Sequence, residues 1–380
     1  MFYDEYIAKN QTWIDGTLAK LDKKLSRVAV ESRDKLPYTT DKNGKHDNCL
    51  DPATGKNVTW WTNGFWGGLM WLMYEKTGNE EYRKTAERSE ELLDGYLMNF
   101  ASLDHDSGFM EHILAGANYR LTGNEKSKNR NLYAAAALAS RYNLTANFIR
   151  AWNWKAELSI IDTMMNLPQL YWASKVIGDT RFKKIAMAHA DMAMKEHIRP
   201  DGSVVHICSH DIEDGHVIET LQGQGYAVGS TWSRGASWAL YGFALSYLHT
   251  QKEEYLDVSK KVANYFIAGC ASNGWLPPVD FRAPEEPVCY DSTAGAIAAC
   301  GLIELAKALP EVEQPMYLKA AVSILKAMEE KFCNWEESTD YILGMGTEAY
   351  GRRVHIPIIY GDYFFTEAIL KLAGSEFNPW

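Results

Sequence analysis

The chain has 380 residues, a formal net charge of −10 and 46% hydrophobic residues. This length fits one large domain or two ordinary ones, and the apolar fraction is sufficient for a substantial core. The negative charge disfavours nucleic acid and an anionic membrane surface as partners.

In chain order, apolar periodicity predicts helices near residues 5–25, 63–77, 80–99, 109–122, 125–146, 162–177, 180–197, 232–250, 253–270, 291–308, 315–333 and 361–373. Two kinds of segment alternate: GFWGGLMWLMY is apolar nearly all round, whereas EEYRKTAERSEELLDGYL has one apolar face. The first kind is typical of buried helices and the second of helices that face water on one side. Turns containing Gly78, Gly123 or Gly178 separate such segments. Repeated pairing of an inner with an outer helix predicts an all-α, (α/α)6 six-hairpin barrel, with residues 1–380 as one domain.

Long connections join the helix pairs of this barrel and are expected to gather at one mouth. They cover residues 26–62, 146–161, 198–231, 271–290 and 334–360. Two strand-like pieces, 203–208 and 353–360, are expected inside these connections. Connections of this length are usually functional or disordered, and these carry Trp and His residues, which indicates a binding pocket.

Two acidic stretches precede predicted inner helices. In LDHDSGF, Asp104 and Asp106 flank His105, and in SIIDTMMNLPQL, Asp162 stands among apolar residues. Pro168 is tolerated only in the first turn of a helix, so we expect that helix to begin near 163–166 with Asp162 at its start. Each carboxylate is therefore either a helix cap or an acid at the barrel mouth. Carboxyl pairs held in different protonation states are the usual acid and base of carbohydrate hydrolysis.

The stretch STWSRGASWALYGFA opens another inner helix with Trp232, Arg234 and Trp238. The helix dipole disfavours a cation at this end. Arg234 therefore either binds a ligand carboxylate through its planar guanidinium or pairs with a structural acid. His206, Cys208 and His210 alternate in HICSHD, but no fourth residue completes a metal site, so none is predicted.

Several long stretches together resemble the unsaturated glucuronyl hydrolases, glycoside hydrolase family 88. They are WTNGFWGGLMWLMYE, LDHDSGF, IIDTMMNLPQLYWA, STWSRGASWALYGFA, YDSTAGAIAACGL and YGDYFFTEAILKL, and the resemblance runs from about residue 55 to 373. It implies a six-hairpin barrel that acts on oligosaccharides left by polysaccharide lyases, which carry a 4,5-unsaturated uronic acid at the non-reducing end. A carboxylic acid protonates C4 of the vinyl ether, water adds at C5, the hemiketal opens and the sugar chain departs. No metal or organic cofactor is implied.

The resemblance also assigns roles to residues of this chain. The acid/base aspartate falls on Asp162 and the second catalytic aspartate on Asp106. Substrate-binding positions fall on Trp61, His105, His206, Gln222, Trp232, Arg234 and Trp238. Members that accept sulfated glycosaminoglycan fragments carry a Ser, Ser and Lys set, and the nearest positions here are Thr347, Tyr350 and Arg352. Arg352 is expected to meet an anionic group in the next sugar, while the sulfate preference stays open.

Three alternatives remain open. An unsaturated rhamnogalacturonyl hydrolase would use the same chemistry on pectin fragments, and a sugar 2-epimerase would need a His pair as acid and base. A non-catalytic sugar-binding protein is the third. In each case we expect a saccharide partner, no nucleic acid or membrane, and a monomer or weak homodimer. The six cysteines form no CxxC pair and the N-terminus lacks a signal-peptide pattern, which predicts free thiols in a cytoplasmic protein, or a periplasmic one if a leader was removed.

Overall fold

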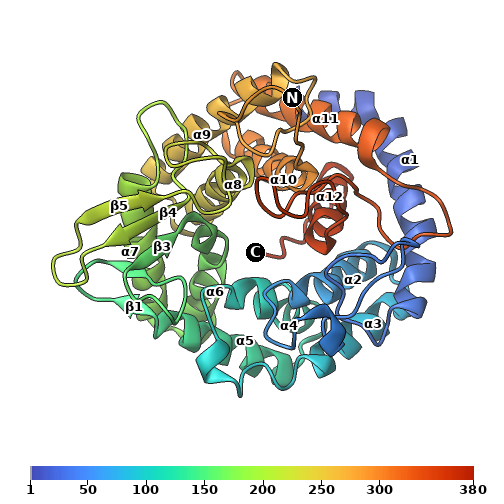
Figure 1. The fold of residues 1–380 in the computed structure, drawn as a ribbon. Helices are drawn as coiled ribbons and strands as arrows, with labels where there is room; N and C mark the ends of the chain where they lie inside the picture. The colour runs from blue at the N-terminus through green and yellow to red at the C-terminus, as the bar shows by residue number, and fades with distance from the viewer. Residues whose placement is uncertain (1) are drawn as a thin grey trace.

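The computed structural model describes residues 2–380, whose helices form a ring of two layers (Figure 1). The inner layer consists of α2 (Asn63–Thr77), α4 (Ala115–Thr122), α6 (Leu167–Ile177), α8 (Ser233–Thr250), α10 (Ser292–Ala308) and α12 (Ile359–Leu372). The outer layer consists of α1 (Phe2–Glu31), α3 (Glu80–Leu92), α5 (Glu125–Ala139), α7 (Thr180–Glu196), α9 (Glu253–Ala271) and α11 (Gln314–Phe332). The predicted six-hairpin barrel is confirmed. No helix in residues 2–380 has the length and apolarity that crossing a membrane requires.

Short sequence signals produce the hairpins between inner and outer helices. Gly78, Gly123 and Gly178 follow α2, α4 and α6 with φ of +69°, +76° and +70°, a conformation that residues with a side chain rarely adopt. The next residue in each case is Asn79, Asn124 or Asp179, whose side chain accepts a backbone N–H of the following outer helix. The dipeptide therefore ends one helix and begins the next.

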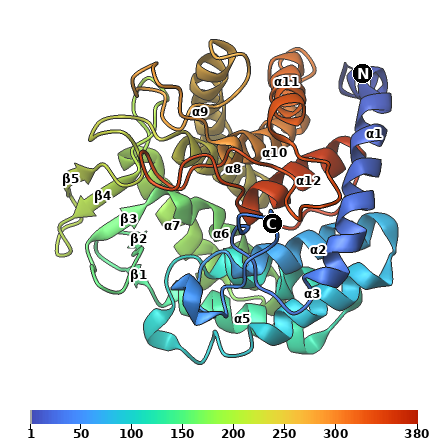
Figure 2. The same ribbon diagram turned by 45° about the vertical axis from the view of Figure 1, so that its right-hand side comes forward.

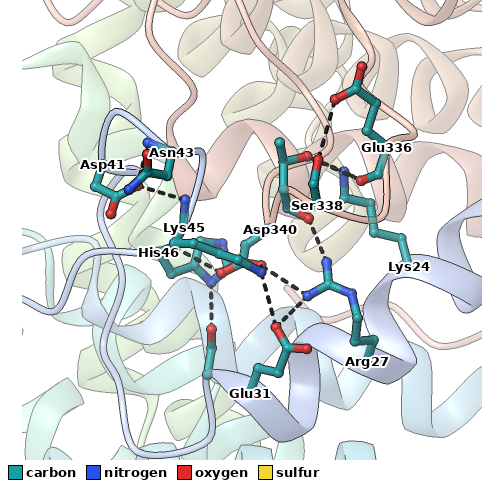
Figure 3. Close-up of polar contacts among 12 residues, drawn as sticks. Lys24, Arg27, Glu31, Asp41, Asn43, Lys45, His46, Glu336, Ser338 and Asp340 are labelled. Atoms are coloured by element: carbon teal, nitrogen blue, oxygen red, sulfur yellow. Dashed lines mark hydrogen bonds and ion pairs between the residues drawn. The ribbon is translucent and has the colours of Figure 1, made fainter.

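The ring closes between the two ends of the chain. Inner helix α12 packs against α2 and α10, while outer helix α1 packs against α3, α11 and α12 (Figure 2). Near this closure the buried carboxylate of Asp340 accepts hydrogen bonds from Lys45 Nζ at 3.0 Å and from the His46 N–H at 3.0 Å. Arg27 of α1 lies 3.2 Å from the same carboxylate (Figure 3). This cluster ties α1 and the connection after it to the last connection of the chain.

A small sheet lies over one side of the ring (Figure 1). Strands β3 (Leu158–Ile160), β4 (Ile207–His210) and β5 (Val217–Leu221) pair antiparallel in the order β3-β4-β5. The short strands β1 (Tyr142–Asn143) and β2 (Phe148–Ile149) form a separate hairpin. Ile160 pairs with Ile207, and the Ile161 N–H donates to the His206 carbonyl at 3.0 Å. This register places Asp162 and His206 beside each other.

Some predicted elements were wrong in extent. In the segment 109–122 only α4 is α-helical, because Gly108–His112 forms a π-helical turn. Residues 161–165 form a 3₁₀ turn before α6, and Pro168 is the second residue of that helix. Of the two strand-like pieces, 203–208 enters β4 only at Ile207, and 353–360 contains no strand and runs into α12.

The helix predicted over 125–146 ends at Ala139, and beyond this end the Arg141 side chain donates to the distant carbonyls of Leu103 and Ala151. One hydrophobic cluster extends through the helices of both layers and includes Ile14 of α1 and Trp380. Such continuity is what a single domain requires, and the one-domain organisation stays a prediction.

Candidate active site

A cavity of about 400 Å³ opens at the mouth of the barrel. It is lined by Tyr38, Thr59, Trp60, Trp61, Asp104, His105, Asp106, Trp152, Ile160, Asp162, His206, Ile207, Gly223, Gln224, Arg234, Glu348, Arg352 and Tyr360. Of the five long connections predicted to build the pocket, four contribute side chains, and 271–290 does not. The connections therefore position the pocket, and the helix ends beneath them support it.

Asp162 and His206 face each other in this cavity. Asp162 Oδ1 lies 3.4 Å from His206 Nε2, and neither atom has a hydrogen-bond partner within residues 2–380. The backbone N–H of Gln224 donates to His206 Nδ1 at 3.0 Å, so Nδ1 is an acceptor and the ring proton lies on Nε2, toward Asp162. Because Asp162 accepts no backbone N–H among these residues, the helix-cap alternative is excluded for it.

The turn that follows β5 fixes the imidazole of His206. Gly223 has φ of +60°, and a side chain there would meet His206 Nδ1 at 2.0 Å. The Trp232 ring also lies against the imidazole, with centroids 4.3 Å apart. The glycine turn and the indole together restrict the position of His206.

A second acidic group comes from LDHDSGF. Asp104 accepts the backbone N–H of Asp106 at 2.9 Å. Asp104 therefore caps this turn, which is one of the two roles that the sequence allowed for it. His105 Nδ1 bonds Thr163 Oγ1 at 3.0 Å, and His105 Nε2 lies 3.5 Å from Asp106 Oδ2. Burial lowers the pKa of His105 to about 3, so the imidazole is neutral. His105 therefore connects Asp106 with the turn that carries Asp162.

Burial controls the protonation of both carboxyl groups in this stretch. It raises the pKa of Asp104 to about 6, against the opposing effects of the Asp106 N–H and the Arg141 guanidinium. The pKa of Asp106 is raised well above its usual range, first by burial and then by the negative charges of Asp104 and Asp162. This shift favours the protonated, neutral form of Asp106, which can donate a hydrogen bond.

Arg234 is 1% exposed and bound within the chain. Its guanidinium pairs with the Asp291 carboxylate and donates to the carbonyls of Thr347 at 2.7 Å and Glu348 at 2.6 Å. It also stacks on Trp232, with the guanidinium carbon 4.3 Å from the ring centroid. The sequence allowed either a ligand carboxylate or a structural acid as the partner of Arg234. The structure shows the structural acid, Asp291, although part of Arg234 also lines the pocket.

Of the other predicted substrate-binding residues, some line the cavity and some do not. Trp61 and Arg352 line the cavity, and Arg352 lies 2.9 Å from the Glu348 carboxylate. Trp232 and Trp238 are 3% and 0% exposed and lie behind the pocket wall. The exposed Gln222 turns away from the cavity and donates to the carbonyls of Gly225 and Tyr226 at 3.0 and 2.9 Å.

Several pocket residues were not predicted. They are Tyr38, Thr59, Trp152, Ile160, Ile207, Gly223, Gln224, Glu348 and Tyr360, whereas Trp60 was among the loop residues that indicated the pocket. Gln224 precedes a glycine just as Gln222 does, so the glutamine motif matches both positions. Trp152, in the stretch AWNWK of a long connection, was a usable signal because an indole in a loop is a common sugar-stacking group.

Outside the pocket, Asp211, Asp214 and His216 lie close together on the turn between β4 and β5. Exposed acidic groups of this kind are common in proteins without a bound metal.

Comparison with known proteins gives the chain a family. No protein-family model matches it. It is 33% identical over 369 residues to an unsaturated glucuronyl hydrolase of Bacillus sp. (strain GL1), covering 91% of this chain and 93% of that protein. The chain belongs to the unsaturated glucuronyl hydrolase family. It is also 32% identical over 349 residues to an unsaturated chondroitin disaccharide hydrolase of Streptococcus pneumoniae, covering 84% of this chain and 85% of that one.

Solved structures of this hydrolase family have the same fold. The Bacillus sp. GL1 unsaturated glucuronyl hydrolase superposes with a TM-score of 0.84 at 32% identity, over 91% of this chain and 95% of that one. A mutant of an unsaturated glucuronyl hydrolase with dGlcA-Glc-Rha-Glc gives the same TM-score of 0.84, with the same identity of 32% and coverage of 91% and 95%. The resemblance stated from the sequence is confirmed, and the protein is a glycoside hydrolase.

Proposed function

We propose that the protein removes a 4,5-unsaturated uronic acid from the non-reducing end of lyase-generated oligosaccharides by hydrating the C4=C5 bond. The observation that carries this function is the pair Asp162 Oδ1 and His206 Nε2, 3.4 Å apart and unpartnered among the described residues, in the mouth cavity. A carboxyl group in this position can transfer a proton directly to an atom of a bound substrate. The unsaturated saccharide bound by a relative in the same fold supports the assignment.

In the first step, protonated Asp162 donates its proton to C4, and the ring oxygen supplies electrons to C5. The resulting cation at C5 takes up a water molecule, and the carboxylate of Asp162 accepts the proton that the water releases. The bond between C5 and the ring oxygen of this hemiketal then breaks. C1 becomes an aldehyde and the remaining sugar leaves with the glycosidic oxygen. One carboxyl group therefore serves as acid and then as base, and its protonation state is restored.

The surrounding residues orient the substrate. Neutral Asp106 donates a hydrogen bond to a sugar hydroxyl, and the His206 Nε2–H is directed at the same space. Trp61 and Trp152 line the cavity and offer indole faces to the flattened unsaturated ring. Two cations line the cavity, the buried Arg234 and the exposed Arg352. We assign Arg234 to the electrostatic environment of the substrate carboxylate and Arg352 to the next sugar.

A panel of unsaturated disaccharides tests the function, with loss of the ultraviolet absorbance of the conjugated C4=C5 bond as the readout. We expect turnover of glucuronyl disaccharides of the chondroitin, hyaluronan or gellan type, with unsaturated rhamnogalacturonan fragments as the contrasting substrate. Turnover of the pectin fragment alone would establish the rhamnogalacturonyl alternative. Binding without any loss of absorbance would favour a sugar-binding protein or an epimerase and would contradict hydration.

The pH dependence tests the neutral state of Asp106. The negative charge of Asp104 raises the pKa of Asp106, so Asp104→Asn is expected to lower that pKa. The alkaline limb of kcat/KM, where Asp106 loses its proton, should then move to lower pH by about one unit. The amide oxygen can still accept the Asp106 N–H, which preserves the turn. An alkaline limb that stays in place, or moves to higher pH, would rule out a protonated Asp106 in the active enzyme.

We also propose that the enzyme acts in the cytoplasm as a monomer or weak homodimer. The six cysteines lie within the described residues and none forms a disulfide, which suits a reducing compartment. Fractionation of the source cells followed by size-exclusion chromatography tests both points. Activity confined to an extracytoplasmic fraction, or a stable larger assembly, would contradict them.

A further inference from the structure

Two tryptophans lead from the cavity to the protein surface. The rings of Trp152 and Trp154 are stacked, with centroids 5.6 Å apart and an interplanar angle of 19°. Trp152 lines the cavity and is half-buried, whereas Trp154 is 69% exposed. An exposed indole at the edge of a binding site offers apolar area that a bound ligand can cover. The pair is therefore a continuous aromatic surface that begins inside the active site and ends outside it.

The segment that carries this pair is firmly held. Asn153, between the two tryptophans, donates through Nδ2 to the carbonyls of Ala101 at 2.7 Å and Leu103 at 2.8 Å. Its Oδ1 accepts a hydrogen bond from Arg141 at 2.8 Å. Arg141 is 7% exposed and also bonds the carbonyl of Ala151 at 2.9 Å. Trp154 is thus presented by an anchored turn, which reduces the entropy that a ligand must overcome on binding.

The chemistry around Trp154 indicates what covers it. A flat aromatic face packs against the C–H face of a pyranose ring, as the indoles inside the cavity are proposed to do. Lys155 Nζ lies 5.8 Å from the Trp154 ring centroid and 3.8 Å from Glu157 Oε1. An aromatic face beside an ammonium group suits a sugar ring that carries a carboxylate.

We propose that Trp154, with Lys155, forms an outer subsite for the third sugar of the oligosaccharide, a uronate in substrates whose uronic acids alternate with neutral or amino sugars. This inference rests on the proposed function, because the first two sugars occupy the cavity in front of Asp162. The third sugar leaves the cavity along the aromatic surface and stacks on the exposed face of Trp154. The enzyme is therefore built to take tetrasaccharides in preference to disaccharides.

The proposal is tested by comparing the unsaturated disaccharide and tetrasaccharide from one polysaccharide. The wild-type enzyme should have the higher kcat/KM on the tetrasaccharide. Trp154→Ala should lower kcat/KM on the tetrasaccharide by about tenfold, through KM, because stacking contributes equally to the ground and transition states. On the disaccharide both constants should stay within about twofold. Trp154→Phe retains an aromatic face and should restore most of the tetrasaccharide preference.

Tyr133→Ala is the matched control, because Tyr133 is 70% exposed on outer helix α5 and outside the cavity lining. It should leave both substrates unaffected. A wild-type enzyme without preference for the tetrasaccharide would overturn the outer subsite, as would equal losses on both substrates in Trp154→Ala or no loss on either. A wild-type enzyme inactive on both substrates would instead contradict the proposed function.

Discussion

Asp162→Asn is expected to lower kcat on an unsaturated disaccharide by about 10³-fold while the barrel stays folded. The amide has nearly the shape of the carboxyl group, but it cannot donate a proton to C4 or accept one from water. Asp162 Oδ1 makes no hydrogen bond within residues 2–380, so the substitution removes no structural contact of that atom. The measurement is the rate of loss of the C4=C5 absorbance, with circular dichroism to verify the fold.

Asp214→Asn is a matched control for this substitution. Asp214 is 67% exposed on the turn between β4 and β5, outside the cavity lining, and the change should leave kcat unaltered. Retention of more than about a tenth of wild-type kcat by Asp162→Asn would show that another group supplies the proton.

Arg234→Lys is expected to lower the free energy of unfolding by about 3 kcal/mol. The guanidinium bridges the Asp291 carboxylate and the carbonyls of Thr347 and Glu348, which belong to two separate parts of the chain. An ammonium group cannot reach all three acceptors, and a buried acceptor without a partner is costly. Denaturant unfolding measures the change.

Activity should fall in the same variant, because Glu348 lines the cavity beside Tyr38 and Gln224. Arg352→Lys is the control for stability, since the Arg352 side chain is 66% exposed and pairs with Glu348 alone among the acidic groups of residues 2–380. An unchanged free energy of unfolding in Arg234→Lys would contradict a structural role. Unchanged kcat and KM would contradict an electrostatic effect of Arg234 on the substrate carboxylate.

Patterns that depend on near neighbours in the sequence were predicted well. Apolar periodicity and the glycines at 78, 123 and 178 located most helices and hairpins, because helix ends are determined locally. The π-helical turn over Gly108–His112 was not predicted. A side chain at Gly64 would lie 2.1 Å from the Phe109 carbonyl, so the turn packs closely against α2, a contact that residues near the turn in the sequence do not indicate.

The same distinction applies to the site. The sequence placed Asp106, His105, Asp162 and His206 in one pocket, and the structure brings all four together. The partner of Arg234 was not predicted, because Asp291 lies 57 residues away and nothing near Arg234 indicates it. Trp238 sits in the same matching stretch as Arg234, but the fold uses it for packing against Phe109 at 5.1 Å.

Reaction in water labelled with heavy oxygen tests hydration of the C4=C5 bond most directly. Water attack at C5 places the label on C5 of the released uronic acid, with none on the departing sugar, and the ultraviolet absorbance disappears in step with release. Label on C1 of a product that keeps its C4=C5 absorbance would mean displacement at the glycosidic carbon, and would contradict the role proposed for Asp162.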